Sequence, residues 1–319
     1  MTGKSDVICI GAALVDMVAQ VERYPLEDDE VYVSNLKLFS GGAAANTAYA
    51  CGKLGLKSIF IGKLGNSDTF GSKIINDFEA VNVDTSLIKY SFEHGTGSAY
   101  IVLNKKGARR IYAHSGAANY LSQSDIKEKE LVSTKIIYLS SLKNIEPLIE
   151  AARVGQKNKI PVILNPGMLI IDQGYLTIKK LLEQIDIFIL SKREFQTLFS
   201  IEDISDNKDF IKKKVFTLFD LGVKAVIVTM GEDGAFLINR EDSEIIQPIL
   251  VKNIKDTTGA GDAFSAGFIY EFIKNPSFHF NDLKKNVEIG NLVAGSCIQK
   301  LGARNGLPNS EELISEFFK

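Results

Sequence analysis

The sequence predicts an α/β fold, with a mainly parallel, doubly wound sheet flanked by helices and a small β-sheet lid. Short β-branched runs alternate with helix-length segments along most of the chain, which is typical of βα units. Two stretches in the first third lack the intervening helix, and the last part of the chain is helical. With 319 residues, 45% of them hydrophobic, the chain can form one large core. We therefore expect a single domain over residues 1–319.

The strands expected in the central sheet are short, continuous apolar runs, because parallel strands are covered on both faces. They span residues 7–10, 58–61, 135–139, 161–164, 187–190 and 225–229. From Gly261 onward the pattern becomes helical, and helices are expected at residues 263–273, 283–299 and 310–318.

The two irregular stretches lie at about residues 16–39 and 97–112. Each contains strand-forming residues such as Val31 and Tyr100 without a helix between them. The turn at residues 104–107 has the character of a hairpin connection. We interpret the two stretches as a small β appendage beside the main sheet, which could close over a ligand.

Charge and composition exclude several classes of partner. The 37 basic and 39 acidic residues give a net charge of -2, so nothing electrostatic favours a nucleic-acid or anionic-membrane partner. Cys9, Cys51 and Cys297 lack the paired spacing of a zinc site and are expected to be buried free thiols. No apolar run approaches the ~20 residues that cross a bilayer, and no apolar signal segment follows the N-terminus. We expect a cytoplasmic protein.

The most informative segment reads Asp-Thr-Thr-Gly-Ala-Gly-Asp-Ala-Phe at residues 256–264, directly before an apolar helical run. Gly259 and Gly261 permit positive φ, so the N–H groups around Ala260 can converge on one anion at the helix start. Asp262 then lies in the first helical turn, beside the place where a phosphoryl group would be held. Because the helix dipole stabilises a carboxylate there, we expect Asp262 to stay ionised at neutral pH and to be a weak base.

A weak base is sufficient for phosphoryl transfer, because the attacking hydroxyl loses its proton late and positioning supplies most of the rate. The alternative is a glycine-containing turn in which Asp262 is an ordinary residue of a helix start. A lone Gly-x-Gly would favour that alternative. The complete nine-residue string favours the catalytic interpretation.

Residues 256–264 closely resemble the C-terminal signature of the ribokinase-like carbohydrate kinases. Residues 41–46, Gly-Gly-Ala-Ala-Ala-Asn, resemble the N-terminal signature of the same family. The resemblance spans nearly the whole chain and implies the ribokinase-like fold. It implies an ATP-dependent kinase that transfers the γ-phosphoryl group to a primary hydroxyl of a sugar, namely a pentose, a hexose or a keto-deoxy sugar. In that role Asp262 is the catalytic base, and Gly259, Ala260 and Gly261 hold the phosphate.

Two other functions stay open beside the sugar kinase. One is a nucleoside kinase that phosphorylates the ribose 5'-hydroxyl. The other is a non-catalytic sensor of a sugar or nucleotide, which the intact Asp262 argues against. A dinucleotide-dependent oxidoreductase is disfavoured, because the first strand end at Gly11 lacks the Gly-x-Gly-x-x-Gly pattern.

The resemblance also implies a set of substrate-binding residues. Asp16 matches the aspartate that hydrogen-bonds substrate hydroxyls in the family, although a turn or helix cap would explain it too. Gly41, Gly42 and Asn46 would line the same pocket, with the glycines allowing substrate to approach the backbone. Asn46 could also be the N-cap of the next helix.

Nucleotide-binding residues follow from the same resemblance. Thr229, Gly231 and Gly234 come directly after a strand and resemble the family's nucleotide-binding turn. Such glycines are common in hairpin turns and would be weak evidence alone. Asn291 matches a family position near the adenine, although a solvent-facing polar residue of a helix is an alternative.

The resemblance implies two metal-binding positions. Glu194 matches a glutamate that organises Mg²⁺ through its water shell, but Ser191 replaces the family's asparagine in that motif. A monovalent cation such as K⁺ is commonly bound by carbonyls around the positions of Asp256 and Thr258. Lid strands of the family often pair between subunits, which implies a homodimer formed through the lid.

Departures from the family pattern concern the substrate. Ribose-specific members have a lysine where this chain has Ala43, and a glutamate where it has Lys143, so a strict ribokinase is disfavoured. Residues 41–48 resemble archaeal-type nucleoside kinases, whereas residues 116–121 are closer to general sugar kinases. The two observations disagree, and the acceptor stays open.

Overall fold

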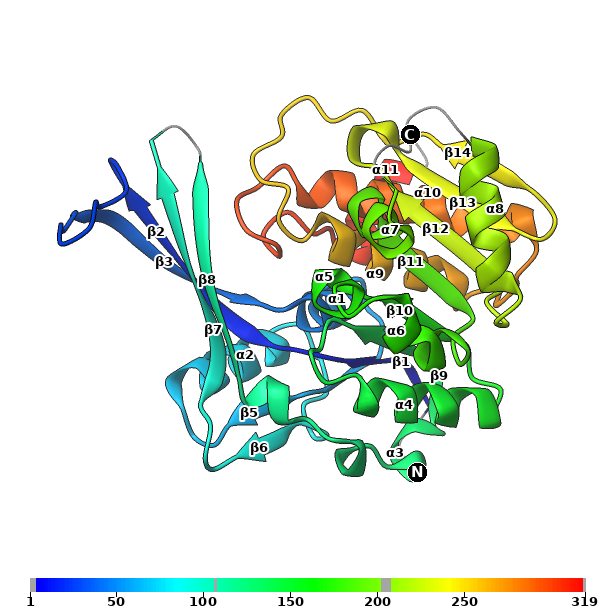
Figure 1. The fold of residues 1–319 in the computed structure, drawn as a ribbon, viewed down its shortest axis with the longest axis horizontal. Coiled ribbons are helices and arrows are strands. Elements are labelled where there is room, and N and C mark those ends of the chain that lie inside the picture. The colour runs from blue at the N-terminus through cyan, green and yellow to red at the C-terminus, as the bar shows by residue number, and fades with distance from the viewer. Residues whose placement is uncertain (1–3, 106–107, 202–207, 318–319) are drawn as a thin grey trace.

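The computed structural model describes residues 4–105, 108–201 and 208–317. An eight-stranded sheet forms the centre, and a separate four-stranded sheet projects from one edge of the body (Figure 1). The strand order of the central sheet is β14-β13-β12-β11-β10-β9-β1-β4. The expected fold class is confirmed.

Six neighbouring strands of the central sheet are parallel, and two more continue it as an antiparallel edge. The parallel strands are β4 (Ser58–Ile61), β1 (Ser5–Ile10), β9 (Thr134–Ser140), β10 (Val162–Asn165), β11 (Ile187–Ser191) and β12 (Ala225–Thr229). The edge strands are β13 (Ala235–Asn239) and β14 (Ser243–Ile246). All six predicted strands are present, because continuous apolar runs can be buried on both faces of a sheet. The antiparallel edge was not predicted.

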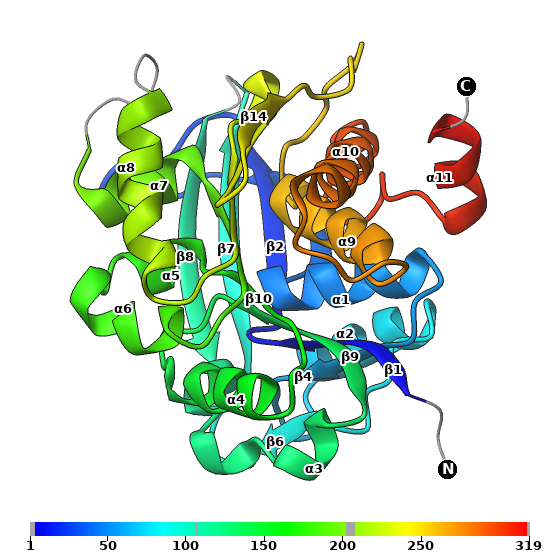
Figure 2. The same cartoon turned by 90° about the vertical axis from the view of Figure 1, so that its right-hand side faces the viewer.

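Helices cover both faces of the sheet (Figure 2). The two faces have separate cores. The helices of one face are α1 (Ala43–Lys53), α2 (Thr69–Glu79), α9 (Ala260–Phe272), α10 (Phe280–Cys297) and α11 (Ser310–Phe317). Those of the other face are α3 (Glu128–Leu131), α4 (Glu146–Lys157), α5 (Gly167–Ile171), α6 (Tyr175–Leu182), α7 (Lys192–Phe199) and α8 (Lys208–Phe219). The three predicted C-terminal helices are present. The first of them begins at Ala260, three residues earlier than expected, because Gly259 adopts the left-handed conformation that ends the preceding turn.

The smaller sheet arises from the two irregular stretches. Its strands, in the order β3-β2-β7-β8, are β3 (Val33–Gly41), β2 (Leu14–Val21), β7 (Thr96–Asn104) and β8 (Arg109–Gly116). Strands β7 and β8 pair antiparallel, as a hairpin requires, although residues 106–107 of the predicted turn lie outside the described residues. Strand β2 follows β1 after only three residues, so the smaller sheet starts at the carboxyl end of a central strand. A two-stranded sheet of β5 (Lys63–Gly65) and β6 (Lys89–Ser91) lies nearby.

The cysteine prediction is confirmed, because Cys9, Cys51 and Cys297 are free and buried. Across the described ranges, no helix combines the length and apolarity needed to span a membrane.

Candidate active site

Two neighbouring cavities lie on either side of residues 254–257, the first against the smaller sheet and the second against the start of α9. The first has a volume of about 480 Å³ and the second about 440 Å³. Both are lined by Ile254 and Thr257, so they share one wall. An arrangement of two adjacent cavities is suited to a reaction between two small molecules.

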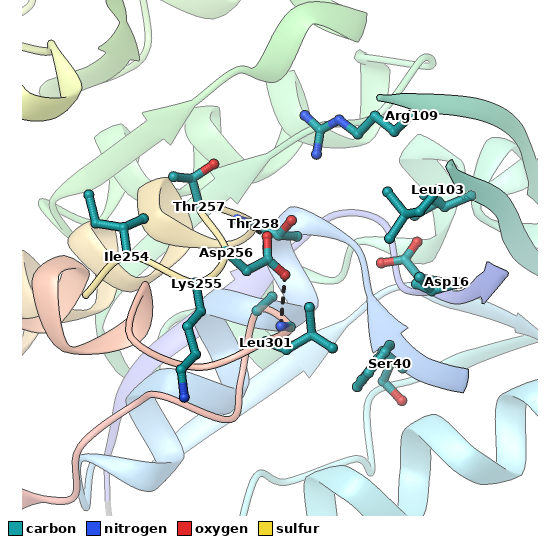
Figure 3. A pocket seen from close by; sticks show the side chains of 15 residues that line it. Asp16, Ser40, Leu103, Arg109, Ile254, Lys255, Asp256, Thr257, Thr258 and Leu301 are labelled. Atoms are coloured by element: carbon teal, nitrogen blue, oxygen red, sulfur yellow. Dashed lines mark hydrogen bonds between the residues drawn. The ribbon is translucent and has the colours of Figure 1, made fainter. Parts of the chain in front are cut away.

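The first cavity lies between the smaller sheet and residues 254–258. Asp16 and Asp256 face each other across it, and Arg109 reaches over it from β8 (Figure 3). Asp16 is paired with Phe39 in the next strand, and both point into the cavity from the same face of the sheet. Asp16 therefore belongs to a strand, and the alternative interpretation as a turn or helix cap is wrong.

The second cavity contains the predicted nucleotide-binding residues. Thr229 ends β12, and the cavity is lined by Thr229, Gly231, Gly234 and Asn291. Gly231 and Gly234 have φ values of 63° and 83°, which glycine adopts without strain. The Asn291 side chain is buried and donates to the carbonyls of residues 246 and 247, at 3.3 and 3.0 Å. The alternative of a solvent-facing Asn291 is wrong.

The start of α9 forms the boundary of the second cavity, and its two glycines have different surroundings. Gly259 has a φ of 79°, and a Cβ there would lie 2.4 Å from the Cβ of Ala303. A Cβ on Gly261 would meet nothing within 4 Å, because that position opens into the cavity. The Ala260 N–H donates to the Thr257 carbonyl at 3.2 Å. The N–H of Ala260 is thus already paired. An anion at this helix start would therefore be bound first by the N–H of Gly261.

Asp262 lies in the first turn of α9 and keeps part of its surface exposed. Its Oδ2 accepts a hydrogen bond of 2.9 Å from Asn46 Nδ2. Asn46 Oδ1 in turn accepts a hydrogen bond of 2.9 Å from Arg304 Nε. Asn46 is buried and is not among the residues that line either cavity, so its contact with substrate stays a prediction, whereas its hydrogen bond to Asp262 is present. It is not an N-cap either, because α1 is capped at Gly42.

The charge state predicted for Asp262 is corrected by its surroundings. Desolvation by the packed protein raises the pKa of Asp262 to about 7, although the Asn46 hydrogen bond and the Arg304 charge lower it. The charges of Glu194 and Asp16 raise it further. Loss of hydration is therefore the largest influence on the pKa of this carboxylate. Desolvation likewise raises the pKa of Asp16 to about 6, against the lowering effect of Arg304.

The raised pKa of Asp262 should make the stability of the protein depend on pH. Between pH 3.8 and about 7 the native state holds a proton on Asp262 that the unfolded chain has lost, so this group lowers stability as the pH rises. We expect Asp262→Asn to raise the Tm by roughly 5 °C at pH 8 and to change it little near pH 4. Scanning calorimetry at both pH values measures this. An equal Tm difference at the two values would contradict the assigned pKa.

The glycines of the N-terminal signature accommodate Asp16 and the neighbouring backbone. A Cβ on Gly41 would lie 2.4 Å from Asp16 Oδ2, so only glycine leaves room for that carboxylate. Gly42 has a φ of 94°, and a Cβ there would lie 2.5 Å from the carbonyl oxygen of Ala12. Both positions therefore require glycine, because a side chain would overlap Asp16 or the backbone of Ala12.

Glu194 and Ser191 form a capping box at the start of α7. Glu194 Oε2 accepts from the Ser191 N–H at 2.7 Å, and Ser191 Oγ accepts from the Glu194 N–H at 3.2 Å. Ser191, which occupies the position of the family's asparagine, thus holds Glu194 in place. Within the described part of the chain, no group of three or more histidine, cysteine or acidic side chains is placed to hold a metal ion.

Asp256 closes the loop between the two cavities. Its carboxylate accepts a hydrogen bond of 3.0 Å from the N–H of Thr258 and one of 2.8 Å from the N–H of Gly302, the latter drawn in Figure 3. Burial raises the pKa of Asp256, but these hydrogen bonds and the charge of Arg109 outweigh it and hold the pKa below its ordinary value. Asp256 is therefore ionised at neutral pH.

Two arginines near the site were not found from the sequence. Arg109 comes from β8, and Arg304 comes from the loop between α10 and α11. No periodicity distinguishes either residue from the other basic residues, because only tertiary packing brings them to the cavities. Arg304 is 8% exposed, which is rare for an arginine and could not be read from a loop sequence.

A doubly wound sheet with two adjacent cavities and a carboxylate at a helix start is compatible with a phosphotransferase that acts on an alcohol group, and the comparisons show that class. Residues 4–310 match the family described as pfkB family carbohydrate kinase. The chain belongs to the pfkB family of carbohydrate kinases, and it is a sugar or nucleoside kinase.

Individual relatives agree with the family. A ribokinase from Staphylococcus aureus is 29% identical over 316 residues, which are 98% of this chain and 99% of the relative. An uncharacterized sugar kinase from Archaeoglobus fulgidus is 31% identical over 261 residues, 81% of this chain and 98% of the relative. The structure of Arabidopsis thaliana ribokinase complexed with ribose and ATP has a TM-score of 0.85, 26% identity and 98% coverage of both chains.

Proposed function

We propose that this protein transfers the γ-phosphoryl group of ATP to a primary hydroxyl of a pentose, a hexose or a keto-deoxy sugar. The observation that carries the proposal is Asp262, a half-buried residue whose carboxylate accepts a hydrogen bond from Asn46. It directly follows Ala260 and Gly261, which line the second cavity. The Arabidopsis ribokinase relative is complexed with ribose and ATP, which supports the assignment of one cavity to each substrate.

In this mechanism the sugar occupies the first cavity and ATP the second. Asp16 accepts hydrogen bonds from sugar hydroxyls, and the start of α9 receives the phosphate through its N–H groups. Asp262 orients the attacking hydroxyl and accepts its proton as the new O–P bond forms, while the bond between the γ-phosphorus and the bridging oxygen breaks and ADP leaves. A pKa of about 7 leaves a large ionised fraction at neutral pH and makes the carboxylate a stronger base than an exposed aspartate.

Cations complete the proposal. Mg²⁺ usually keeps several waters and uses one or two carboxylates together with substrate phosphates. Glu194 fits that role through water, because the capping box uses Oε2 and the charge of Glu194 acts on Asp262. When bound, Mg²⁺ would neutralise the phosphate charge. K⁺ would be held by carbonyls around Asp256 and Thr258, in the loop that the Asp256 carboxylate fixes by accepting from two backbone N–H groups.

A nucleoside is the second candidate acceptor, and the lining of the first cavity favours it. Val18, Phe39, Ile101 and Leu103 give that cavity an apolar wall, against which a base could pack. The acceptor would then be the ribose 5'-hydroxyl, and the roles of Asp16 and Asp262 would be unchanged.

One screen tests the proposed function. Release of ADP from MgATP should be measured with pentoses, hexoses, keto-deoxy sugars and nucleosides, and each product should be identified by ³¹P NMR. We expect turnover with a sugar. Turnover with nucleosides alone would select the second candidate. Binding without turnover across the whole panel would instead support a sensor.

We propose that the smaller sheet, as part of one domain over residues 1–319, is a lid and also forms a homodimer. Its cavity face carries Asp16, whereas its other face carries a row across four strands: Leu38, Met17, Tyr100 and Tyr112. Tyr112 is 64% exposed, which leaves an apolar surface uncovered on one chain. A second copy of the same row would cover it.

Sedimentation velocity tests the homodimer. The wild-type protein should sediment as a dimer at micromolar concentration, and Tyr112→Lys should sediment as a monomer, because lysine places charge in the apolar row. Leu176→Lys on α6 is the control, since Leu176 is 85% exposed and lies outside the smaller sheet. A monomeric wild-type protein would rule out the dimer.

A further inference from the structure

Arg304 lies directly under the first cavity without lining it. Gly302 and Ala303 line that cavity, and Arg304 follows them with its side chain turned into the protein, 8% exposed. Its Nε donates to Asn46 Oδ1 at 2.9 Å. Arg304 can therefore influence the reaction only through the groups that it contacts and through its charge.

The charge of Arg304 is not neutralised by one close partner. Nη1 lies 3.9 Å from Asp77 Oδ2, and the guanidinium lies over the rings of Tyr49 and Phe78, at 4.8 and 5.6 Å from their centroids. Within the described residues, Nη1 and Nη2 have no hydrogen-bond partner. Burial lowers the pKa of Arg304 to about 10, so it is still charged at neutral pH. Its field also reaches Asp262 and Asp16.

The hydrogen bond from Arg304 to Asn46 determines the orientation of the Asn46 amide. A guanidinium only donates, so it requires the oxygen of Asn46 on its side. The NH₂ group of Asn46 then points to Asp262 Oδ2, where it is found. If the amide turned over, its oxygen would face the carboxylate and repel it.

We propose that Arg304 is a positioning residue for phosphoryl transfer, which directs the Asn46 amide at Asp262 and supplies the positive charge that Asp262, Asp16 and Asp77 share. This inference rests on the proposed role of Asp262 as the base. It assigns a function to a residue outside both signature motifs.

Removal of Arg304 would change the balance of charges around Asp262. The groups that act on it are Asn46 and Thr47 from α1, Asp16 from β2, Tyr138 from β9, Glu194 from α7 and Cys297 from α10. Asp16 and Glu194 are negatively charged and raise the pKa of Asp262, whereas Arg304 is positively charged and lowers it. Its loss should raise that pKa and move the acid limb of the kcat profile to higher pH.

The test compares Arg304→Gln and Arg304→Lys. We expect Arg304→Gln to lower kcat at pH 7 about tenfold and to move the acid limb up by about one pH unit, with the KM for ATP changed less than about twofold. Arg304→Lys keeps the charge, so its acid limb should stay near the wild-type position while kcat falls. Arg153→Gln, which removes an exposed partner of Glu150 on α4, is the control and should match the wild type.

A purely structural Arg304 would give a different result. Both Arg304 variants would then lose thermal stability, while the folded enzyme would keep the wild-type pH profile, and that outcome overturns the proposal. A ¹³C NMR titration of the Asp262 carboxyl in wild type, Arg304→Lys and Arg304→Gln needs no turnover, with Asp262→Asn to assign the signal. It therefore remains decisive if no compound of the panel is phosphorylated. An identical titration in all three proteins would equally overturn the proposal.

Discussion

Replacing Asp262 with asparagine is expected to lower kcat by roughly 10²–10⁴-fold, the usual contribution of a general base. Asparagine has nearly the same shape and can still accept the hydrogen bond from Asn46, but it cannot take the proton of the attacking hydroxyl. The Kd for ATP should change little, because the walls of the second cavity are not altered. The loss should therefore appear in the chemical step.

Single-turnover kinetics and calorimetric ATP binding would measure the two quantities separately. Asp282→Asn is a matched control, because Asp282 occupies the same third position of the first turn in α10 as Asp262 does in α9. Asp282 does not line either cavity, and its variant should keep the wild-type kcat. A near-normal kcat for Asp262→Asn would remove the base assignment.

Gly261→Val is expected to abolish productive ATP binding, with kcat/KM for ATP lower by roughly 10²-fold or more, because the phosphate would be displaced. A Cβ at this position meets no protein atom within 4 Å and projects into the second cavity. Gly261 also has no positive φ in this structure, so a side chain is tolerated by the backbone. The Tm should therefore stay close to that of the wild type.

Gly259→Ala is the informative comparison. Its φ of 79° and the 2.4 Å approach to Ala303 mean that a side chain there strains the fold itself, at a cost of about 1–3 kcal/mol. We expect a lower Tm for Gly259→Ala and an unchanged Tm for Gly261→Val. If Gly261→Val bound ATP normally, the phosphate would not lie at the start of α9.

Much of the fold was predictable because its signals are local. A strand such as Ile187–Ser191 is a continuous apolar run, and such runs are recognisable without knowledge of their neighbours. The antiparallel edge of β13 and β14 was missed, because strand order depends on which distant segments pair. The predicted start of α9 was three residues too late, because Gly259, with its positive φ, is already the N-cap of the helix.

The site was predictable to a smaller extent. Residues 256–264 identify Asp262, since glycines before a carboxylate at a helix start are a local pattern. Asn46 was assigned to the substrate, and its hydrogen bond to Asp262 spans 216 positions of sequence. Arg304 was not noticed, because only its burial makes it unusual.

The amino-acid sequence by itself determined the βα order, the glycine-bounded start of α9 and the presence of a carboxylate in its first turn. Only the tertiary structure decided how that carboxylate is oriented and charged. Desolvation by the folded protein raises its pKa to about 7, whereas the helix dipole alone predicted an ionised, weakly basic group. The difference has a physical reason: hydration and charge at Asp262 depend on Asn46, Arg304 and Glu194, which come together only when the chain is folded.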